Sequence, residues 1–133
     1  DHKRSIKLNE LNKIFDLKIN YFILQRDVST DDLELIKKKE NIFYLKDDLQ
    51  DFENTSVICS SMDFVISVDT SIAHLSGCLG KKTILLLQYF PYFFWLNKID
   101  YSIWYDDFKI FRQTNDYNWQ SVIENLSKYL KSI

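Results

Sequence analysis

The residues best suited to hold a charged ligand lie in one segment, residues 65–84. It starts with Val-Ile-Ser-Val, which has the composition of a buried strand, and Asp69, Thr70 and Ser71 follow directly. A helix starting there would present unpaired N–H groups and a partial positive charge, and two hydroxyls would add donors. His74 lies one helical turn after Thr70, on the same face. The segment predicts either a phosphate site or a plain helix cap beside a structural histidine.

A second set of polar residues, Gln25 and Arg26, follows the apolar run 19–24. Short apolar runs alternate with amphipathic ones along the chain, which predicts an α/β domain with a parallel sheet. Right-handed crossovers give the strand order 2-1-3-4-5, which reverses between the strands over 19–24 and 63–68. Ligands of such sheets bind beside the carboxyl ends of the strands at this reversal. The predicted diphosphate site is formed by Gln25, Arg26, Thr70, Ser71 and His74.

The elements that must position these residues follow from hydrophobic spacing. Strands are expected over 19–24, 42–45, 63–68, 83–87 and 109–112. Helices are expected over 5–15, from Ser29 or Thr30 to lysines 37–39, and over 52–62, 70–79 and 118–130. Gly80 suits the end of the fourth of these helices. In the last helix one face gathers Trp119, Val122, Ile123, Leu126 and Leu130. The prediction is one Rossmann-like domain over 1–133, a three-layer sandwich with a mainly parallel five-stranded sheet.

Composition excludes several classes of protein. The 133 residues carry a formal charge of −2, so no basic excess favours nucleic acid. Two cysteines, Cys59 and Cys78, provide no disulfide scaffold or metal-ligand spacing and suggest a reducing, cytoplasmic compartment. Both are expected to be buried and inert, and no metal or cofactor is expected. No apolar run approaches the roughly 20 residues of a membrane span. Glycine-rich dinucleotide and P-loop motifs are absent from the sequence.

An aromatic segment, residues 89–105, follows the fourth expected strand, and nine of its seventeen residues are aromatic. Its rings could stack on a base or a sugar. We favour a lid or an interface for Phe90, Phe93, Phe94 and Trp95, because an exposed cluster of this size favours association. The sequence therefore predicts a homo-oligomer that buries part of this segment.

Several motifs occur together in a recognisable order. They are Asp1-His-Lys-Arg-Ser5, Phe22-Ile-Leu-Gln25, Leu49-Gln-Asp-Phe52, Met62 to Gly77, Ser102-Ile-Trp-Tyr105 and Ile110-Phe-Arg-Gln113. With these motifs the chain resembles the C-terminal lobe of glycosyltransferase-family-9-like domains. These domains are related to heptosyltransferases and are often attached to tetratricopeptide repeats.

The resemblance implies half of a GT-B architecture, in which this lobe binds the nucleotide-sugar donor. Thr70 and Ser71 would meet the donor diphosphate, and His74 would lie near the ribose or phosphate. Gln25 and Arg26 would line the same cleft. Asp1 and Arg4 would belong to a polar loop at the lobe interface.

The sequence departs from the family pattern in three ways that limit the function to be expected. Family members carry a strand before the Asp1–Ser5 loop, so this chain lacks a central strand, and its neighbours must pair directly or leave a gap. The N-terminal lobe, which would hold the acceptor, is absent from this sequence. Tyr92-Phe93-Phe94 replaces a polar Asp-Trp-Arg.

The expected function is therefore a donor-binding lobe that would transfer a hexose or heptose only when completed by an N-terminal lobe. The alternative is a non-catalytic interaction module that retains the fold. A weaker third possibility is a flavodoxin-type nucleotide-binding protein, which a flavin absorbance spectrum would reveal.

Overall fold

The computed structural model describes residues 3–115 and 118–133. The strands are β1 (Tyr21–Ile23), β2 (Ile42–Tyr44), β3 (Val65–Val68), β4 (Thr83–Leu87) and β5 (Phe108–Arg112). The α-helices are α1 (Asn12–Phe15), α2 (Thr30–Lys38), α3 (Phe52–Ser60), α4 (Ser71–Cys78) and α5 (Gln120–Ser132). Short 3₁₀ turns are η1 (Leu8–Leu11), η2 (Lys46–Asp48) and η3 (Phe93–Trp95).

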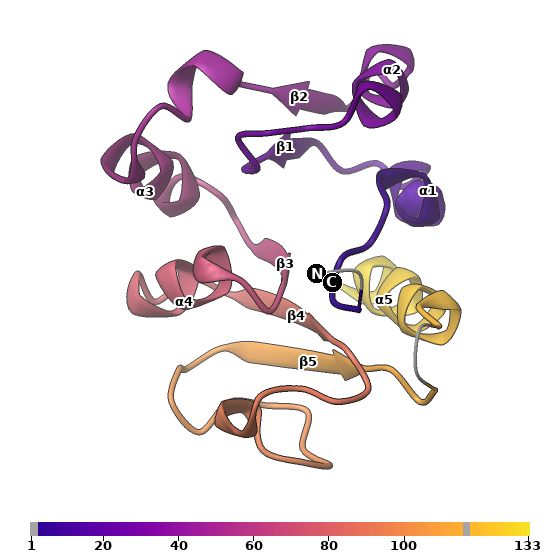
Figure 1. Cartoon of the computed structure of the whole chain (residues 1–133), viewed down its shortest axis with the longest axis vertical. Coiled ribbons are helices and arrows are strands. Elements are labelled where there is room, and N and C mark those ends of the chain that lie inside the picture. Colours follow the sequence, from indigo (N-terminus) through magenta and orange to yellow (C-terminus); the bar gives the residue numbers. More distant parts are fainter. Residues whose placement is uncertain (1–2, 116–117) are drawn as a thin grey trace.

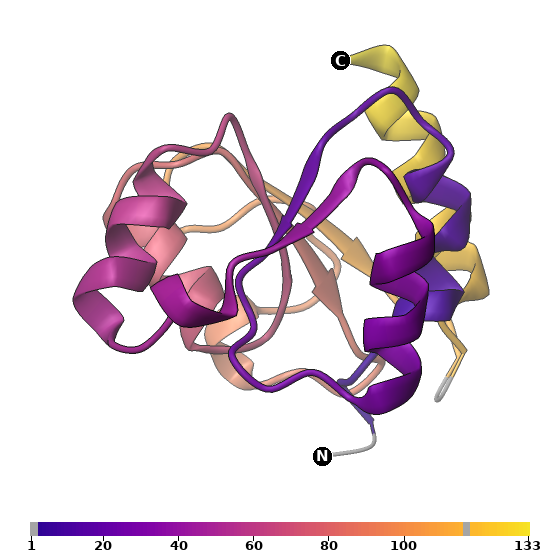
Figure 2. The same cartoon turned by 90° about the horizontal axis from the view of Figure 1, so that it is seen from above.

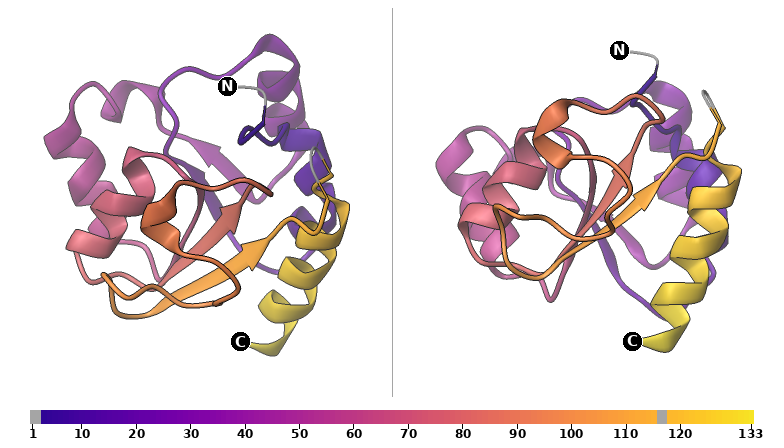
Figure 3. Two further views of the ribbon diagram at one scale, coloured as in Figure 1. Left: turned by 60° about the horizontal axis from the view of Figure 1, so that its bottom comes forward. Right: turned by 90° about the horizontal axis from the view of Figure 1, so that it is seen from below.

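The helices cover both sides of the strands. Figure 1 shows α3 and α4 on one side and α1, α2 and α5 on the other, with the strands in a column between them. Figure 3 repeats this arrangement from two further directions, with yellow α5 and indigo α1 together on one side. The expected three-layer α/β arrangement is therefore confirmed in outline.

The predicted single five-stranded sheet is wrong. The strands form two separate parallel sheets, β1–β2 and β3–β4–β5. Among the described residues β1 pairs only with β2, in register Tyr21 to Ile42, and β3 pairs only with β4, in register Val65 to Thr83. Within the described residues β1 and β3 are thus not paired with each other, and Figure 1 shows them lying apart.

Local signals set most helix boundaries. The Ser29 hydroxyl accepts a hydrogen bond from Asp32 N–H at 3.2 Å and so caps α2 as expected. After α4, Gly80 adopts φ +66°, the left-handed conformation that glycine tolerates best. The helix expected over 5–15 is shorter, because the chain is still extended at Lys7, before η1 and α1.

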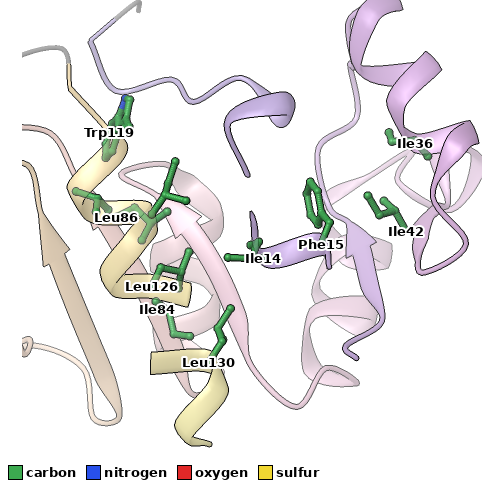
Figure 4. Packing of buried hydrophobic residues seen from close by; sticks show 11 residues of the cluster. Ile14, Phe15, Ile36, Ile42, Ile84, Leu86, Trp119, Leu126 and Leu130 are labelled. Carbon is green, nitrogen blue, oxygen red and sulfur yellow. The ribbon is translucent and has the colours of Figure 1, made fainter. Parts of the chain in front are cut away.

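The core lies on both sides of β4, whose residues are all buried. Side chains alternate along a strand, so Ile84 and Leu86 face one side while Leu85 and Leu87 face the other. The first pair packs with α1, α2 and α5 in the largest cluster (Figure 4). The second pair packs with Ala73, Trp95, Phe108 and Ile110. The predicted apolar face of α5 is confirmed, since all five of its residues are buried.

Candidate functional site

A groove runs between the two sheets, and we call it the central groove. Its volume is about 1800 Å³, and its walls include β1 and β3 together with the loops at their carboxyl ends. Gln25, Arg26, Thr70 and Ser71 all line it. Four of the five predicted diphosphate residues therefore share one concave surface.

The start of α4 provides two hydroxyls at this surface. Thr70 is the N-cap residue in extended conformation, yet its hydroxyl makes no cap hydrogen bond to the helix. Instead it lies 3.1 Å from the Ser67 hydroxyl and donates to the Val68 carbonyl at 3.4 Å. Ser71 is exposed. The Thr70 hydroxyl thus does not cap this helix start, so the alternative of a plain Thr70 cap is wrong.

Asp69 is almost fully buried beside the same helix start. Arg4 donates from Nη1 to the Asp69 carbonyl oxygen at 3.2 Å and also lines the central groove. The Asp69 carboxylate lies 4.0 Å from His74 Nε2, so it faces the histidine. Of the two residues expected in a lobe-interface loop, Arg4 is at the groove and Asp1 lies outside the described residues.

Gln25 and Arg26 occupy the exposed loop after β1. The Gln25 side chain donates from Nε2 to the Asp27 carbonyl at 2.6 Å, which orients its amide along the loop. The Tyr44 hydroxyl donates to the Arg26 carbonyl and ties the loop to β2. Within the described part of the chain the Arg26 guanidinium makes no hydrogen bond or ion pair, so it is available to an anion.

His74 is the predicted site residue that the structure separates from the others, because it is not among the residues that line the central groove. Its ring stacks on Trp95 with centroids 5.2 Å apart and meets Phe94 edge-on at 5.1 Å. His74 Nδ1 and the Tyr105 hydroxyl are hydrogen-bonded at 2.9 Å. The side chain is still 40% exposed. These partners favour the structural interpretation of this histidine.

Tyr105 reaches His74 only because residue 77 is a glycine. A Cβ atom at Gly77 would lie 2.5 Å from the Tyr105 ring, far inside van der Waals contact. Burial raises the pKa of Tyr105. The motif Ser102-Ile-Trp-Tyr105 was visible in the sequence, but its contact with α4 was not, since nothing local indicates it.

Arg112 and Gln113 fix the aromatic segment, a role that sequence reasoning missed. The Arg112 guanidinium donates to the carbonyl oxygens of Trp95, Leu96 and Ile99 at 2.7, 3.0 and 2.9 Å. Gln113 is buried, and its Oε1 accepts from Tyr89 N–H at 2.9 Å. The Phe-Arg-Gln motif therefore anchors the segment at both its start and its middle.

The aromatic segment divides into core and surface. Trp95 is only 2% exposed and belongs to the core, so the expectation of a lid or interface is wrong for this residue. Phe93 is 88% exposed, and other outward-facing members are Tyr89, Phe90, Tyr92, Tyr101, Ile103 and Trp104. Figure 1 shows the segment at the end of the molecule farthest from β2.

The cysteines differ from each other in their surroundings. Cys59 is buried, and burial raises the pKa of its thiol, which disfavours the reactive thiolate. Cys78 is exposed, contrary to expectation. No three His, Cys, Asp or Glu side chains within residues 3–115 and 118–133 are grouped to hold a metal ion. None of the helices in those ranges is long and apolar enough to cross a membrane.

Comparison with known proteins identified no relative of this chain. No protein-family model matches the sequence, and neither a curated protein nor a solved structure matches the chain. The likeness to glycosyltransferase-family-9-like domains thus stands on the motifs quoted above.

Proposed function

We propose that the chain is the donor-binding lobe of a glycosyltransferase and holds the diphosphate of a nucleotide sugar in the central groove. One observation carries the proposal: Arg26, whose guanidinium has no partner among the described residues, lines the same groove as Thr70 and Ser71, at a helix start that the Thr70 hydroxyl does not cap. A cation and a helix N-terminus facing one concave surface are complementary to a diphosphate. The groove also lies beside the carboxyl ends of β1 and β3, where ligands of such sheets bind.

Titration calorimetry with nucleoside diphosphates and nucleotide sugars tests this binding. The variant Arg26→Ala should bind about tenfold or more weakly, because a charge-assisted hydrogen bond contributes roughly 1.5–3 kcal/mol. Lys128→Ala is the matched control, since Lys128 is an exposed cation on α5 and is not part of the groove lining. Unchanged affinity of Arg26→Ala would remove Arg26 from the site, and no binding of any nucleotide would overturn the proposal.

We propose further that this chain alone transfers no sugar. Transfer requires donor and acceptor to be held in register, and the residues proposed here account for the donor diphosphate alone. Incubating the purified chain with nucleotide sugars and simple glycoside acceptors should give no product above the rate without protein. Robust turnover would contradict this assignment.

A second candidate function is self-association without catalysis. The exposed rings of Phe90, Tyr92 and Phe93 favour it, because large apolar side chains gathered on one surface are typical of an interface. Sedimentation velocity at micromolar concentration should then show a dimer or larger species that Phe93→Ser converts to monomer. Phe52→Ser is the matched control, since Phe52 is an exposed ring on α3, outside the aromatic segment. A monomer at all concentrations would exclude this candidate.

The two free cysteines fit a reducing compartment, so we also propose a cytoplasmic location. Fractionation of cells that produce the protein tests it, and recovery from an oxidising compartment would contradict it.

A further inference from the structure

Trp104 is an exposed residue whose ring is nevertheless held in one position. It is 59% exposed, and its ring stacks on Phe94 with centroids 5.2 Å apart and planes inclined by 21°. Trp104 Nε1–H donates to the Phe94 carbonyl at 3.0 Å, and the Trp104 backbone N–H donates to the Ser102 hydroxyl oxygen at 3.0 Å. A ring fixed in this way loses little conformational freedom when a ligand binds to it. Trp104 is therefore preorganised as a contact surface.

The support beneath Trp104 extends into the core. Phe94 meets Trp95 edge-on with centroids 4.9 Å apart and meets His74 edge-on at 5.1 Å. Trp95 in turn stacks on Phe108 at 5.9 Å, and both of these rings are buried. Trp104 thus lies at the outer end of a series of rings whose inner end is core.

One face of the Trp104 indole remains open. Phe94 covers the other face, and Trp104 contacts no further aromatic ring within residues 3–115 and 118–133. The single polar atom of the ring is already bonded to the Phe94 carbonyl. The open face is therefore a flat apolar surface, and it suits a ligand that is flat and apolar on one side.

The charges near Trp104 restrict the ligands further. Asp106 and Asp107 follow it closely in the chain, both are exposed, and neither carboxylate has a hydrogen bond or ion pair among the described residues. The single cation of the aromatic segment, Lys98, lies with Arg112 in a shallow depression along β5. Two carboxylates repel the phosphates of a nucleotide or of an anionic lipid, but they accept hydrogen bonds from neutral hydroxyl groups.

A neutral sugar fits this surface better than a cation does. Sites for quaternary ammonium groups enclose the cation in a cage of several aromatic rings. Trp104 instead offers one flat face, and its neighbour Phe94 lies nearly parallel behind it. A pyranose ring with equatorial substituents has a flat face of axial C–H groups and carries its hydroxyls at the rim. Such a ring can stack on the indole and direct its hydroxyls to carboxylates beside it.

We propose that the open face of Trp104 binds a neutral pyranose ring, with Asp106 and Asp107 as acceptors for its hydroxyl groups. The site is separate from the central groove, because no residue within 89–105 lines that groove. In Figure 2, seen from the end that carries β2, the orange aromatic segment lies behind the strands. In the right-hand view of Figure 3, from the opposite end, it lies in front. The proposal is therefore independent of nucleotide binding in the groove.

Tryptophan fluorescence is the first test. The other two tryptophans, Trp95 and Trp119, are buried, so quenching by acrylamide reports mainly on Trp104. The probes are cellotetraose and chitotetraose, neutral oligosaccharides whose rings carry equatorial substituents. At least one of them should reduce the quenching as its concentration rises into the millimolar range. Unchanged quenching with both probes would overturn the proposal.

Calorimetric titration of variants with the protecting saccharide is the second test. Trp104→Ala should bind the saccharide at least about tenfold more weakly, because aromatic rings provide most of the contact at such sites. Phe93→Ala is the matched control, since Phe93 is an exposed ring of the same segment without a stacking partner among the described residues. It should keep the native affinity. Equal affinities of the two variants would overturn the proposal.

A third variant leaves Trp104 and its supports in place. Asp106→Asn combined with Asp107→Asn removes both charges, and asparagine tolerates the φ of +54° that Asp107 adopts. Hydrogen bonds to charged acceptors are the stronger ones, so the affinity for the saccharide should fall about tenfold. Unchanged affinity would overturn the role assigned to the two carboxylates.

Two controls on the native chain test the class of ligand. Choline chloride should not displace the bound saccharide, and displacement would assign the face of Trp104 to a cation instead. Acrylamide quenching without saccharide should not depend on the protein concentration. A decrease at higher protein concentration would assign this face to a second copy of the chain and overturn the proposal.

Discussion

The two sheets of this molecule differ in how completely their strand residues are buried. In the larger sheet, β4 lies between two partners, and every one of its residues is buried by clusters on both sides. In the smaller sheet, β1 and β2 are short, and Phe22 stacks on Phe43 at 5.0 Å with exposed fractions of 38% and 39%. Burial stabilises a strand most when other elements cover both of its faces. Only the larger sheet is covered in this way.

This contrast bears on the candidate ligand site, which draws residues from both halves. Thr70 and Ser71 follow β3 of the larger sheet, whereas Gln25 and Arg26 follow the short, partly exposed β1. Regions with few buried apolar contacts open more readily than the core. We therefore expect the side of the groove that carries Arg26 to change conformation more readily than the side formed by the start of α4.

The largest effect should come from removing core volume in the larger sheet. Leu85→Ala creates a cavity at a fully buried position and should lower the free energy of unfolding by about 2–5 kcal/mol. Phe22→Ala, in the smaller sheet, should cost clearly less because that ring is partly exposed. Urea denaturation of both variants measures the difference, and equal costs would contradict the contrast between the sheets.

The next effect concerns the anchor of the aromatic segment on the larger sheet. Arg112→Met leaves the carbonyl oxygens of Trp95, Leu96 and Ile99 without this donor and should cost about 1–3 kcal/mol. Exchange of amides in the aromatic segment should rise in this variant while that of β1 stays the same. Lys128→Met, at an exposed position of α5, is the control, and an equal loss there would show that the three carbonyl contacts contribute little.

A smaller effect on stability is expected at Gly77, and its sign should differ between the native chain and a Tyr105→Ala background. Gly77→Ala pushes a methyl group into the Tyr105 ring, which costs roughly 1–3 kcal/mol, and a gain in helix propensity of about 1 kcal/mol offsets part of it. In a Tyr105→Ala background the clash is gone, so the same substitution should stabilise α4. Thermal unfolding of the four proteins gives both values. A destabilising effect in both backgrounds would mean that Tyr105 is not the obstacle.

The smallest effect belongs to the smaller sheet and depends on pH. Burial raises the pKa of Tyr21 from 10.0 to about 12, and its hydroxyl donates to the Ile14 carbonyl at 2.7 Å. A raised pKa of an acid means that the stabilisation is complete below about pH 10 and is lost as pH rises toward 12. Tyr21→Phe should cost about 0.5–1.5 kcal/mol near pH 7 and lose less stability than the native chain above pH 10.

Denaturation curves between pH 8 and 12 provide the measurement, with Tyr101→Phe as a control because Tyr101 is exposed. Parallel pH profiles for the native chain and Tyr21→Phe would show that Tyr21 is not the group responsible.

Many of the elements were predictable because their signals are local. β4 spans Thr83–Leu87 as expected, and the Ser29 cap, the Gly80 turn and the apolar face of α5 were all visible in residue types and spacing. The carboxyl-end position of Gln25, Arg26, Thr70 and Ser71 followed from strand order. The contacts of His74 could not be predicted, because the aromatic partners that hold it come from residues 94–105, which are distant in the sequence.

By itself the sequence determined the succession of strands and helices, since hydrophobic period and capping act over a few neighbouring residues. Only the tertiary structure decided that β1 and β3 stay apart, because pairing of parallel strands depends on long-range packing of the helices above them. It also decided that Trp95 is core while Phe93 is surface, although the two are near neighbours in one aromatic run. Burial depends on which side chains other segments bring to each position, and residue type alone does not carry that information.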